Sequence, residues 1–405
     1  NYYSMFNQKI KRKMKNIFII LSRDPRSAQI LMFLINSLLS KNYHIHLFCH
    51  ESKTSTDTYE KIKFINENIK IHSLKIGDSN KFNFIKRALH IIKELKKIKP
   101  VHIIAVDKKS FLIVPILNLF NKKFKKIHMI LDFENPSNES LKESIITKIQ
   151  FFFSKNVDFF LFPSVERAKK FFEFSKIYNK KFSVLSNHFP INFKPEIGNE
   201  LDKILKEKKI SYSKIICSLG TIGDDHYLHE LIKSVVDWDN DKILIIGGWP
   251  NKNIKEILTK IIIENNLQNK VLILSHISEK LWYEILFKSH LGICFYKQNS
   301  FSNRYMAGPS TKLNNYLLAN IPFLACDNQD FRDFNSKFNM CELVDPSEPK
   351  NISKKINDLL NDQDKYNLLK KNSKNAFLEN LNFDVQFKNM LSELMNLEKN
   401  YNFLD

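Results

Sequence analysis

The stretch KIICSLGTIGDDHYLHELI, residues 214–232, passes from an apolar strand-like run through a turn with two glycines into a helix-like segment. Outward from it, apolar runs alternate with amphipathic segments along most of the chain. The runs at 242–248, 270–276 and 322–327 repeat the strand pattern after it. This rhythm is typical of a parallel sheet covered by helices on both faces.

The same rhythm precedes this stretch, with strand-like runs such as NIFIILS (16–22) and VHIIAVD (101–107). Between the two halves, VLSNHFPINFKPE (184–196) contains two prolines and suits a linker between domains. We therefore predict two Rossmann-like, doubly wound α/β domains. The first covers 1–190 together with a C-terminal helix at 384–405, and the second covers 191–383. A ligand is expected in the cleft between them, beside the carboxyl ends of the strands.

Composition narrows the possible partners. Lys and Arg number 63 against 43 Asp and Glu, a net charge of +20, yet no nucleic-acid-binding motif is present, so we expect no nucleic acid. The five cysteines have no paired spacing, which favours reduced thiols over a zinc or disulfide framework. No apolar run suffices to cross a bilayer, and the basic N-terminus leads into a strand, so a cytoplasmic location is predicted.

The segment 81–99, KFNFIKRALHIIKELKKIK, combines apolar residues at helical spacing with lysines on other faces. Such a helix can pack on a sheet alone, or it can also touch anionic lipid. Both alternatives stay open, and the second would place the protein at the inner face of the cytoplasmic membrane.

The strand of the opening stretch is predicted to end near Ser218, with Gly220 and Gly223 in a short loop and a helix starting near Asp224 or Asp225. Glycines allow close backbone approach, and a helix N-terminus attracts anions, so a diphosphate would fit there. A tight turn without a ligand is the alternative. His226 and His229 stand one helical turn apart, but no third ligand is evident and no metal is expected.

A second candidate anion site lies in GPSTKLNNYLLANIPFLACD, residues 308–327. Ser310 is predicted to cap a helix whose first N–H groups belong to Thr311 and Lys312, and Lys312 adds a positive charge. Asn320 is expected to end this helix in a left-handed conformation. A capped helix without a ligand is the alternative. Two such helix ends in one domain favour a nucleoside diphosphate.

In the first half, two polar segments follow strands. SRDPRSAQ (22–29) offers Arg23, Asp24 and Arg26 for an acceptor phosphate or sugar. LDFEN (131–135) offers Asp132 and Glu134, which could act as a general base or bind sugar hydroxyls. Solvated loops are the alternative in both cases.

The order of these motifs resembles the GT-B glycosyltransferases, most closely the retaining family 4 (glycosyl transferases group 1) of bacterial surface-glycan synthesis. The resemblance covers nearly the whole chain. RDPR resembles that family's DPR loop, LDFE its Asp-x-His-Glu segment and VLSNHFP its Val-Ile-x-Asn-x-x-Pro linker. Further similar segments are 219–232, 308–327 and ELVDPSEP (342–349).

The resemblance implies a glycosyltransferase, hexosyltransferase-like and retaining. Its C-terminal domain would bind a nucleotide sugar, and its N-terminal domain a glycan or lipid-linked acceptor of capsule, lipopolysaccharide or other surface-glycan synthesis. It implies a last helix that crosses back to the N-terminal domain, and neither metal nor cofactor, because helix ends and basic side chains stabilise the leaving diphosphate.

The chain departs from the family pattern at its Glu-x7-Glu pair, which aligns with Ala307 and Asn315. A CMP-activated donor, or a catalytically degenerate subunit that supports a partner transferase, are therefore alternatives. His226 and Lys312 stand as phosphate cations, and Asn315 keeps a hydrogen-bonding group for the ribose. The expected catalytic residues are Asp132, Glu134, His226 and Lys312; the expected donor-binding residues are Gly220, Thr221, Gly223, Gly248, Ile277, Arg304, Ser310, Thr311, Lys312 and Asn315; the expected acceptor-binding residues are Arg23, Asp24 and Arg26.

Overall fold

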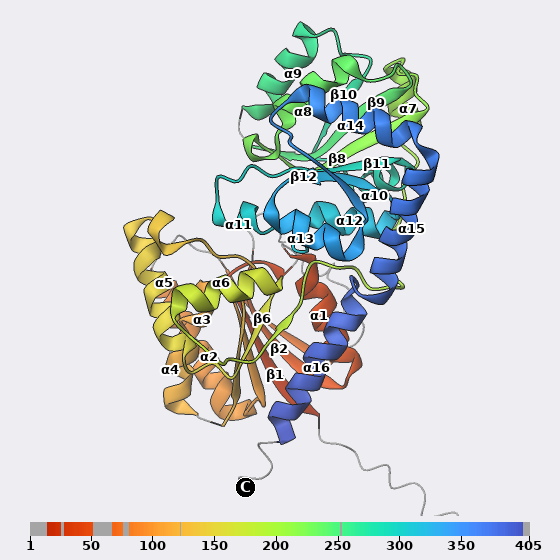
Figure 1. Ribbon diagram of the computed structural model, residues 1–405. Helices are drawn as coiled ribbons and strands as arrows, with labels where there is room; N and C mark the ends of the chain where they lie inside the picture. The colour runs from red at the N-terminus through yellow and green to blue at the C-terminus, as the bar shows by residue number, and fades with distance from the viewer. Residues whose placement is uncertain are drawn as a thin grey trace, which may run out of the picture. The chain divides into compact units, whose positions relative to one another are not determined.

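The computed structural model describes residues 14–25, 28–51, 67–75, 81–121, 123–251 and 253–399. The chain divides into two compact units (Figure 1). Unit 1 comprises Asn1–Leu185 and Phe387–Asp405, and unit 2 comprises Ser186–Gln386.

Unit 1 is built on a parallel seven-stranded sheet in the order β3-β2-β1-β4-β5-β6-β7. This order places β1 next to β4, so the sheet winds in two directions from its centre, as the alternating pattern predicts. The strands are β1 (Lys15–Leu21), β2 (Tyr43–Glu51), β3 (Ile69–Lys75), β4 (His102–Val106), β5 (Lys125–Met129), β6 (Phe159–Phe162) and β7 (Phe182–Val184). The helices are α1 (Gln29–Ser40), α2 (Lys81–Ile98), α3 (Asp107–Phe111), α4 (Val114–Phe120), α5 (Leu141–Ser154), α6 (Val165–Ser175) and α16 (Phe383–Lys399).

The central strands of this sheet are largely apolar, and their apolar side chains are buried on both faces. In β1, for example, Ile17 to Leu21 are all fully buried. Phe18 and Phe48 pack with Ile91 and Leu95 of α2 in one cluster. The continuous apolar runs of the sequence reflect this burial on two sides.

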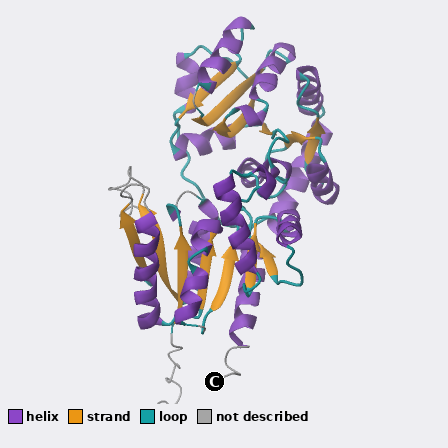
Figure 2. Cartoon of the chain, turned by 90° about the vertical axis from the view of Figure 1, so that its left-hand side faces the viewer, coloured by secondary structure: helices purple, strands orange, loops and turns teal. Residues whose placement is uncertain are grey.

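Unit 2 repeats the design with a parallel six-stranded sheet in the order β10-β9-β8-β11-β12-β13. Its strands are β8 (Lys214–Ile222), β9 (Lys242–Pro250), β10 (Val271–Ser275), β11 (Leu291–Cys294), β12 (Phe323–Cys326) and β13 (Cys341–Val344). Its helices are α7 (Leu201–Glu207), α8 (Leu228–Ser234), α9 (Ile254–Glu264), α10 (Glu279–Lys288), α11 (Phe301–Arg304), α12 (Thr311–Ala319), α13 (Gln329–Phe338), α14 (Pro349–Asn361) and α15 (Gln363–Glu379). Figure 2 shows the strands and helices of each unit in separate colours.

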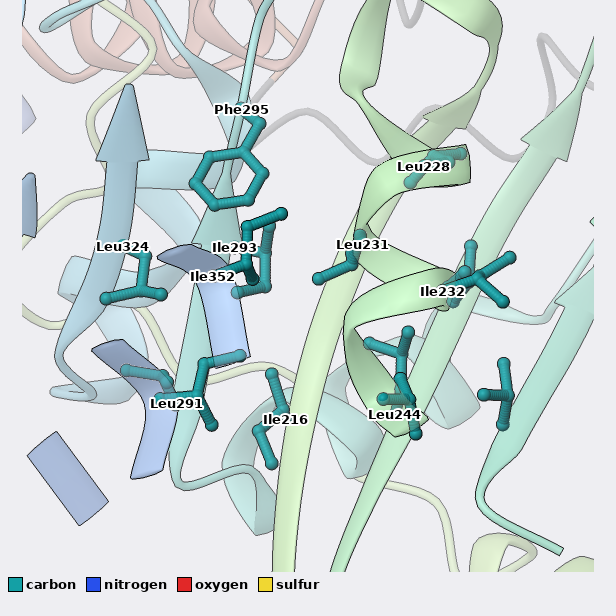
Figure 3. Packing of buried hydrophobic residues seen from close by; sticks show 14 of the residues in the cluster. Ile216, Leu228, Leu231, Ile232, Leu244, Leu291, Ile293, Phe295, Leu324 and Ile352 are labelled. Atoms are coloured by element: carbon teal, nitrogen blue, oxygen red, sulfur yellow. The ribbon is translucent and has the colours of Figure 1, made fainter. Parts of the chain in front are cut away.

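The core of unit 2 joins its sheet to α8 and α14. Strand residues such as Ile216, Leu244 and Ile293 meet Leu231 of α8 and Ile352 of α14, and all five are fully buried (Figure 3). This packing fixes α8 against the strand that precedes it, and it thereby fixes the turn between them.

The last helix, α16, returns to unit 1, as predicted. Glu398 near its end forms an ion pair with Lys15, and its Oε1 lies 2.9 Å from Nε2 of His102. The Tyr43 hydroxyl donates to the same oxygen at 3.0 Å. Burial raises the pKa of Glu398, but the bonds from His102 and Lys15 outweigh it and lower that pKa to about 2. The chain's last described helix is therefore anchored on unit 1 by charge.

The structure also describes the cysteines and the apolar character of the helices. The five cysteines are buried and free, as predicted for reduced thiols. Among the helices of the described ranges, none combines the length and the apolar character that a membrane span requires.

Candidate functional site

The first glycine-containing segment differs from its predicted form. Strand β8 does not end near Ser218 but continues to Ile222, so Gly220 lies inside the strand and pairs with Gly248 of β9. Both glycines have positive φ, +150° and +144°, and a Cβ on Gly248 would lie 1.8 Å from the Gly220 carbonyl oxygen. The long strand persists because its neighbour β9 pairs with it over its whole length. The backbones at Gly220 and Gly248 are so close that residue 248 cannot carry a side chain.

The helix predicted to start near Asp224 or Asp225 begins there only as a short 3-10 turn. Residues Asp224–His226 form one 3-10 turn, and α8 begins at Leu228 after Tyr227, whose φ is +52°. The turn arises because Leu228, Leu231 and Ile232 are drawn into the core, which sets the helix axis and leaves the preceding residues outside it. At the entrance of this turn, a Cβ on Gly223 would lie 2.7 Å from Nδ2 of Asn251, so the end of that side chain would have to shift.

The start of α12 agrees with the prediction. The Ser310 hydroxyl accepts a hydrogen bond from the Leu313 N–H at 3.2 Å and lies 2.7 Å from the Tyr296 hydroxyl oxygen. Asn320 ends the helix with a φ of +53°. The Lys312 side chain extends over Gly220, where an added Cβ would lie 3.0 Å from its Cε. The structure thus brings together Gly220, Ser310 and Lys312 from the two motifs.

Lys312 is a buried cation that forms no ion pair within the described residues, although the charge of Asp225 opposes the lowering of its pKa. Its side chain is 4% exposed, and its Nζ lies 5.5 Å from the centre of the Tyr296 ring. Among the described residues, no carboxylate forms an ion pair with it. Burial lowers the pKa of Lys312 to about 8. A buried ammonium that lacks a counter-ion has a strong preference for an incoming anion.

His226 packs beside this lysine. Its Nδ1 lies 3.3 Å from the Phe295 carbonyl oxygen, and its ring meets Tyr296 edge-on at 5.2 Å. Burial, followed by the charge of Lys312, lowers the pKa of His226 to about 3. The imidazole is therefore neutral at pH 7 in this geometry, and it offers a hydrogen bond rather than the positive charge that the sequence suggested.

The other predicted donor-binding residues differ in how far they are buried. Thr221, Thr311 and Arg304 are exposed, and Arg304 Nε donates to the Gln298 carbonyl at 3.1 Å. Ile277 is half-buried beside Gly247. Asn315 is buried, and its Nδ2 donates to the Thr311 carbonyl at 2.9 Å, so this amide is engaged with its own helix.

Residues of the predicted linker form hydrogen bonds with the segment before α12 and with α12 itself, which the prolines of the linker did not indicate. The Ser186 hydroxyl donates to the Gly308 carbonyl at 2.8 Å, and Asn187 Nδ2 donates to the Pro309 carbonyl at 2.8 Å. His188, which is buried, pairs with Asn314 of α12. Residues 186–188 therefore hold the segment that leads into α12.

In unit 1, the predicted acceptor residues lie where three adjacent strands end. Arg23, after β1, forms an ion pair with Asp107, which directly follows β4. Asp132, after β5, accepts from Nη1 of Arg167 at 3.2 Å. Asp24 and Glu134 are half-buried, and Arg26 lies outside the described residues. Neighbouring strands of a parallel sheet bring these side chains to one edge.

Sequence reasoning missed Asp107 and Arg167. Asp107 has a φ of +60°, and its Oδ1 accepts from the Leu131 N–H at 3.3 Å. Burial raises the pKa of Asp107, while Arg23 opposes that rise. Arg167 is buried and donates to the Leu131 carbonyl at 3.0 Å. The position of Asp107 directly after an apolar strand was a usable signal, whereas Arg167 sits in an ordinary helix and gave none.

Comparison with known proteins agrees with this geometry. Residues 201–376 match the family model described as Glycosyl transferases group 1. No curated protein sequence matches the chain. Among solved structures, Anabaena HepE in complex with UDP and glucose is 12% identical, with a TM-score of 0.72 over 95% of this chain and 100% of that one. A glycosyltransferase from Rickettsia africae is 14% identical, with a TM-score of 0.72 over 96% and 100%.

Sucrose-phosphate synthase from Thermosynechococcus elongatus has the same fold, with 12% identity and a TM-score of 0.70 over 95% of this chain and 99% of that one. The family match lies within unit 2, the unit that contains Gly220, Ser310 and Lys312. The structural likeness extends over both units. The chain thus shares the fold of these glycosyltransferases over both units, and its residues 201–376 match the Glycosyl transferases group 1 family.

Proposed function

We propose that the protein transfers a sugar from a nucleotide-sugar donor to a glycan or lipid-linked acceptor, with retention and without a metal at the transfer site. Unit 2 binds the donor, and unit 1 binds the acceptor. The pathway class is the synthesis of a cell-surface polysaccharide, lipopolysaccharide or glycoconjugate, and the protein works at the inner face of the cytoplasmic membrane.

The observation that carries this proposal is the unpaired, buried Lys312 at the start of α12. Its ammonium lies over Gly220, and the Gly220–Gly248 pair leaves the backbone bare of side chains. A nucleoside diphosphate brings the anion that Lys312 lacks. The first N–H groups of α12 and its dipole add to the attraction.

The chemistry follows from where negative charge develops. As the bond between the anomeric carbon and the diphosphate oxygen breaks, charge accumulates on the leaving oxygen, and the Lys312 ammonium stabilises it. The acceptor oxygen then forms the new bond, and its proton passes to a basic oxygen nearby. Asp132 and Glu134 are the proposed bases or sugar-hydroxyl partners in unit 1, with Arg23 and Asp24 as acceptor contacts.

UDP-sugars are the first donors to test. The HepE structure holds UDP and glucose, and an Escherichia coli trehalose-6-phosphate enzyme of the same fold, with 10% identity and a TM-score of 0.70, holds UDP-2-fluoro glucose. The absence of carboxylates at Ala307 and Asn315 keeps a CMP-activated donor as the competing candidate.

The test is a thermal shift of the purified protein with UDP, GDP, ADP, dTDP, CDP and CMP, without divalent metal. One nucleotide is expected to raise the midpoint of the wild type but not of Lys312→Ala. A response to CMP alone would move the donor class to CMP-sugars. Silence across the whole panel would contradict donor binding and favour the degenerate-subunit alternative.

The acceptor side of the proposal includes contact with an anionic membrane. On α2, Ile85 and Leu89 are more than half exposed, and on the neighbouring α4 Leu119 is 79% exposed. Lys96 Nζ lies 5.4 Å from the centre of the Phe120 ring, which links the two helices. Apolar side chains next to lysines favour the surface of anionic lipid. This geometry supports the second of the two alternatives for 81–99.

Vesicle sedimentation tests that contact. The wild type is expected to sediment with vesicles that contain phosphatidylglycerol and not with pure phosphatidylcholine. Leu89→Asp combined with Leu119→Asp should weaken sedimentation at least tenfold. A matched control is Ile263→Asp combined with Ile257→Asp on α9, two other exposed apolar residues. Equal losses in both double variants would attribute the effect to net charge and contradict the proposed surface.

A further inference from the structure

A cluster of His46, His72 and Glu94 lies in unit 1, on the face of the sheet that α2 covers. His46 is on β2, His72 on β3 at the sheet edge, and Glu94 on α2. All three residues are buried. Within the described ranges, this is the one group of three potential ligands whose donor atoms lie within 4.8 Å of one another. It plays no part in the donor or acceptor roles proposed above.

The spacing of the ligand atoms suits a small tetrahedral ion. Nδ1 of His46 lies 3.1 Å from Nε2 of His72. Two nitrogens bound to one tetrahedral zinc ion are separated by about 3.3 Å, given zinc–nitrogen bonds of about 2.0–2.1 Å. The imidazole nitrogens therefore stand close to their coordinating separation, and the Glu94 carboxylate is within reach on the opposite element.

A metal ion binds an imidazole through an unprotonated ring nitrogen. The hydrogen bond between His46 and His72 uses one proton, which a metal ion would displace.

A third histidine, His90, fixes the orientation of His72. Nδ1 of His72 lies 3.2 Å from Nε2 of His90 on α2. If His72 donates from Nδ1, its Nε2 lone pair points at His46, which is the arrangement of a ligating histidine supported by an outer partner. The Phe48 ring stacks on His72 at 4.4 Å and restricts its orientation further.

Among the described residues, the one ion pair of Glu94 is with a mostly exposed lysine. Lys97 Nζ lies 3.8 Å from the Glu94 carboxylate, and its side chain is 62% exposed. The exposed Lys70 and the half-buried His44 are the other groups whose charges reach His46. A buried carboxylate with a loose partner is costly, and a divalent cation would neutralise it.

We propose that His46, His72 and Glu94 bind one zinc ion, with a water molecule at the fourth position. Two imidazoles and one carboxylate form a donor set that zinc accepts. The ion ties α2 to the two outer strands of the sheet. Its ligands are none of the residues proposed above for the transfer of the sugar.

The test uses the full chain without a polyhistidine tag, stripped with a chelator and dialysed. Titration with zinc chloride at pH 7.5, followed by calorimetry, is expected to show one equivalent bound with a Kd below 1 µM and a higher melting temperature. Glu94→Gln should weaken zinc binding at least tenfold, and His90→Gln should weaken it 10- to 100-fold. The matched control Glu264→Gln, an exposed carboxylate on α9, should bind zinc as the wild type does.

A second measurement does not depend on any variant. Co²⁺ bound to the wild type should show the visible absorption of a four-coordinate nitrogen and oxygen site. A thiolate charge-transfer band would assign the metal to a cysteine and overturn the proposal. Absence of zinc binding below 100 µM would also overturn it, and would leave His46, His72 and His90 as a hydrogen-bonded chain.

Discussion

The buried charges at the strand ends of unit 1 and the buried Lys312 of unit 2 are compensated in different ways. In unit 1, the buried Asp107 has Arg23 as its ion-pair partner, and the buried Arg167 has Asp132. In unit 2, Lys312 is buried against an aromatic ring and, among the described residues, has no carboxylate partner. Both units have the same architecture, so the fold does not explain the difference.

The difference between paired and unpaired buried charges indicates which unit needs an anion from a ligand. A charged side chain in an ion pair is already neutralised in the protein without substrate, and the pair holds both side chains in place. An unpaired buried charge costs stability in the empty protein, and that cost is recovered when a ligand supplies the opposite charge. Under the proposed function, Lys312 of unit 2 is the group that a phosphate would neutralise, whereas the corresponding charges of unit 1 are already paired.

Lys312→Met is expected to produce the largest effect. Loss of the ammonium should weaken nucleotide binding by about 1–3 kcal/mol, the range for a charged hydrogen bond. The same change should raise the free energy of unfolding by roughly 1–3 kcal/mol, because it removes an unpaired buried charge. Calorimetry and denaturant unfolding measure the two quantities. A variant that loses stability along with binding would show that Lys312 is already paired.

The second prediction concerns pH. The pKa of Lys312 is lowered from 10.5 to about 8 in the folded protein, so the charged form is disfavoured by folding. Its penalty is fully present below pH 8, and the stability of the wild type relative to Lys312→Met should rise between pH 8 and 10.5.

Nucleotide affinity should change in the opposite direction. Binding requires the ammonium, so the affinity of the wild type should fall above pH 8, by up to about tenfold per pH unit. Calorimetry in buffers of different ionisation enthalpy should show proton uptake near pH 8.5. A flat profile from pH 7 to 10 would contradict the unpaired cation.

Asp107→Asn tests the paired side of the comparison. Asparagine tolerates the positive φ of this position, so the change isolates the charge. The free energy of unfolding should fall by about 1 kcal/mol, a value kept small because Arg23 is partly exposed. Sugar transfer should decline while nucleotide binding stays unchanged. Asp364→Asn, an exposed carboxylate on α15, is the control, and equal effects in both would remove Asp107 from the site.

The last prediction concerns Tyr296. Tyr296→Phe removes the hydroxyl that lies 2.7 Å from Ser310 Oγ but keeps the ring beside Lys312. Stability should fall by about 0.5–1.5 kcal/mol, with nucleotide affinity nearly unchanged. Tyr296→Leu also removes the ring and should change the midpoint pH of nucleotide binding. Identical pH profiles for the two variants would show that the ring does not affect the cation.

Local sequence signals identified much of unit 2. Ser310 and Asn320 marked both ends of α12, because a cap hydroxyl and a left-handed asparagine act within one turn of the chain. The same reasoning failed at Gly220, where pairing with β9 extended the strand past the glycine. It also failed at residues 186–188, whose contacts are with Gly308, Pro309 and Asn314, over 120 residues away.

The sequence by itself determined the two α/β units and the identity of Lys312 as a candidate phosphate cation, and its resemblance to a known family implied the return of the last helix. These features can be predicted from apolar periodicity, helix caps and the order of motifs, which are visible in short stretches of the sequence. The tertiary structure alone decided the ionisation of Lys312 and His226, because a pKa depends on burial and on neighbours from other elements. It also decided that Asp107 meets Arg23, and that His46, His72 and Glu94 meet under α2, since those contacts join segments that the sequence keeps apart.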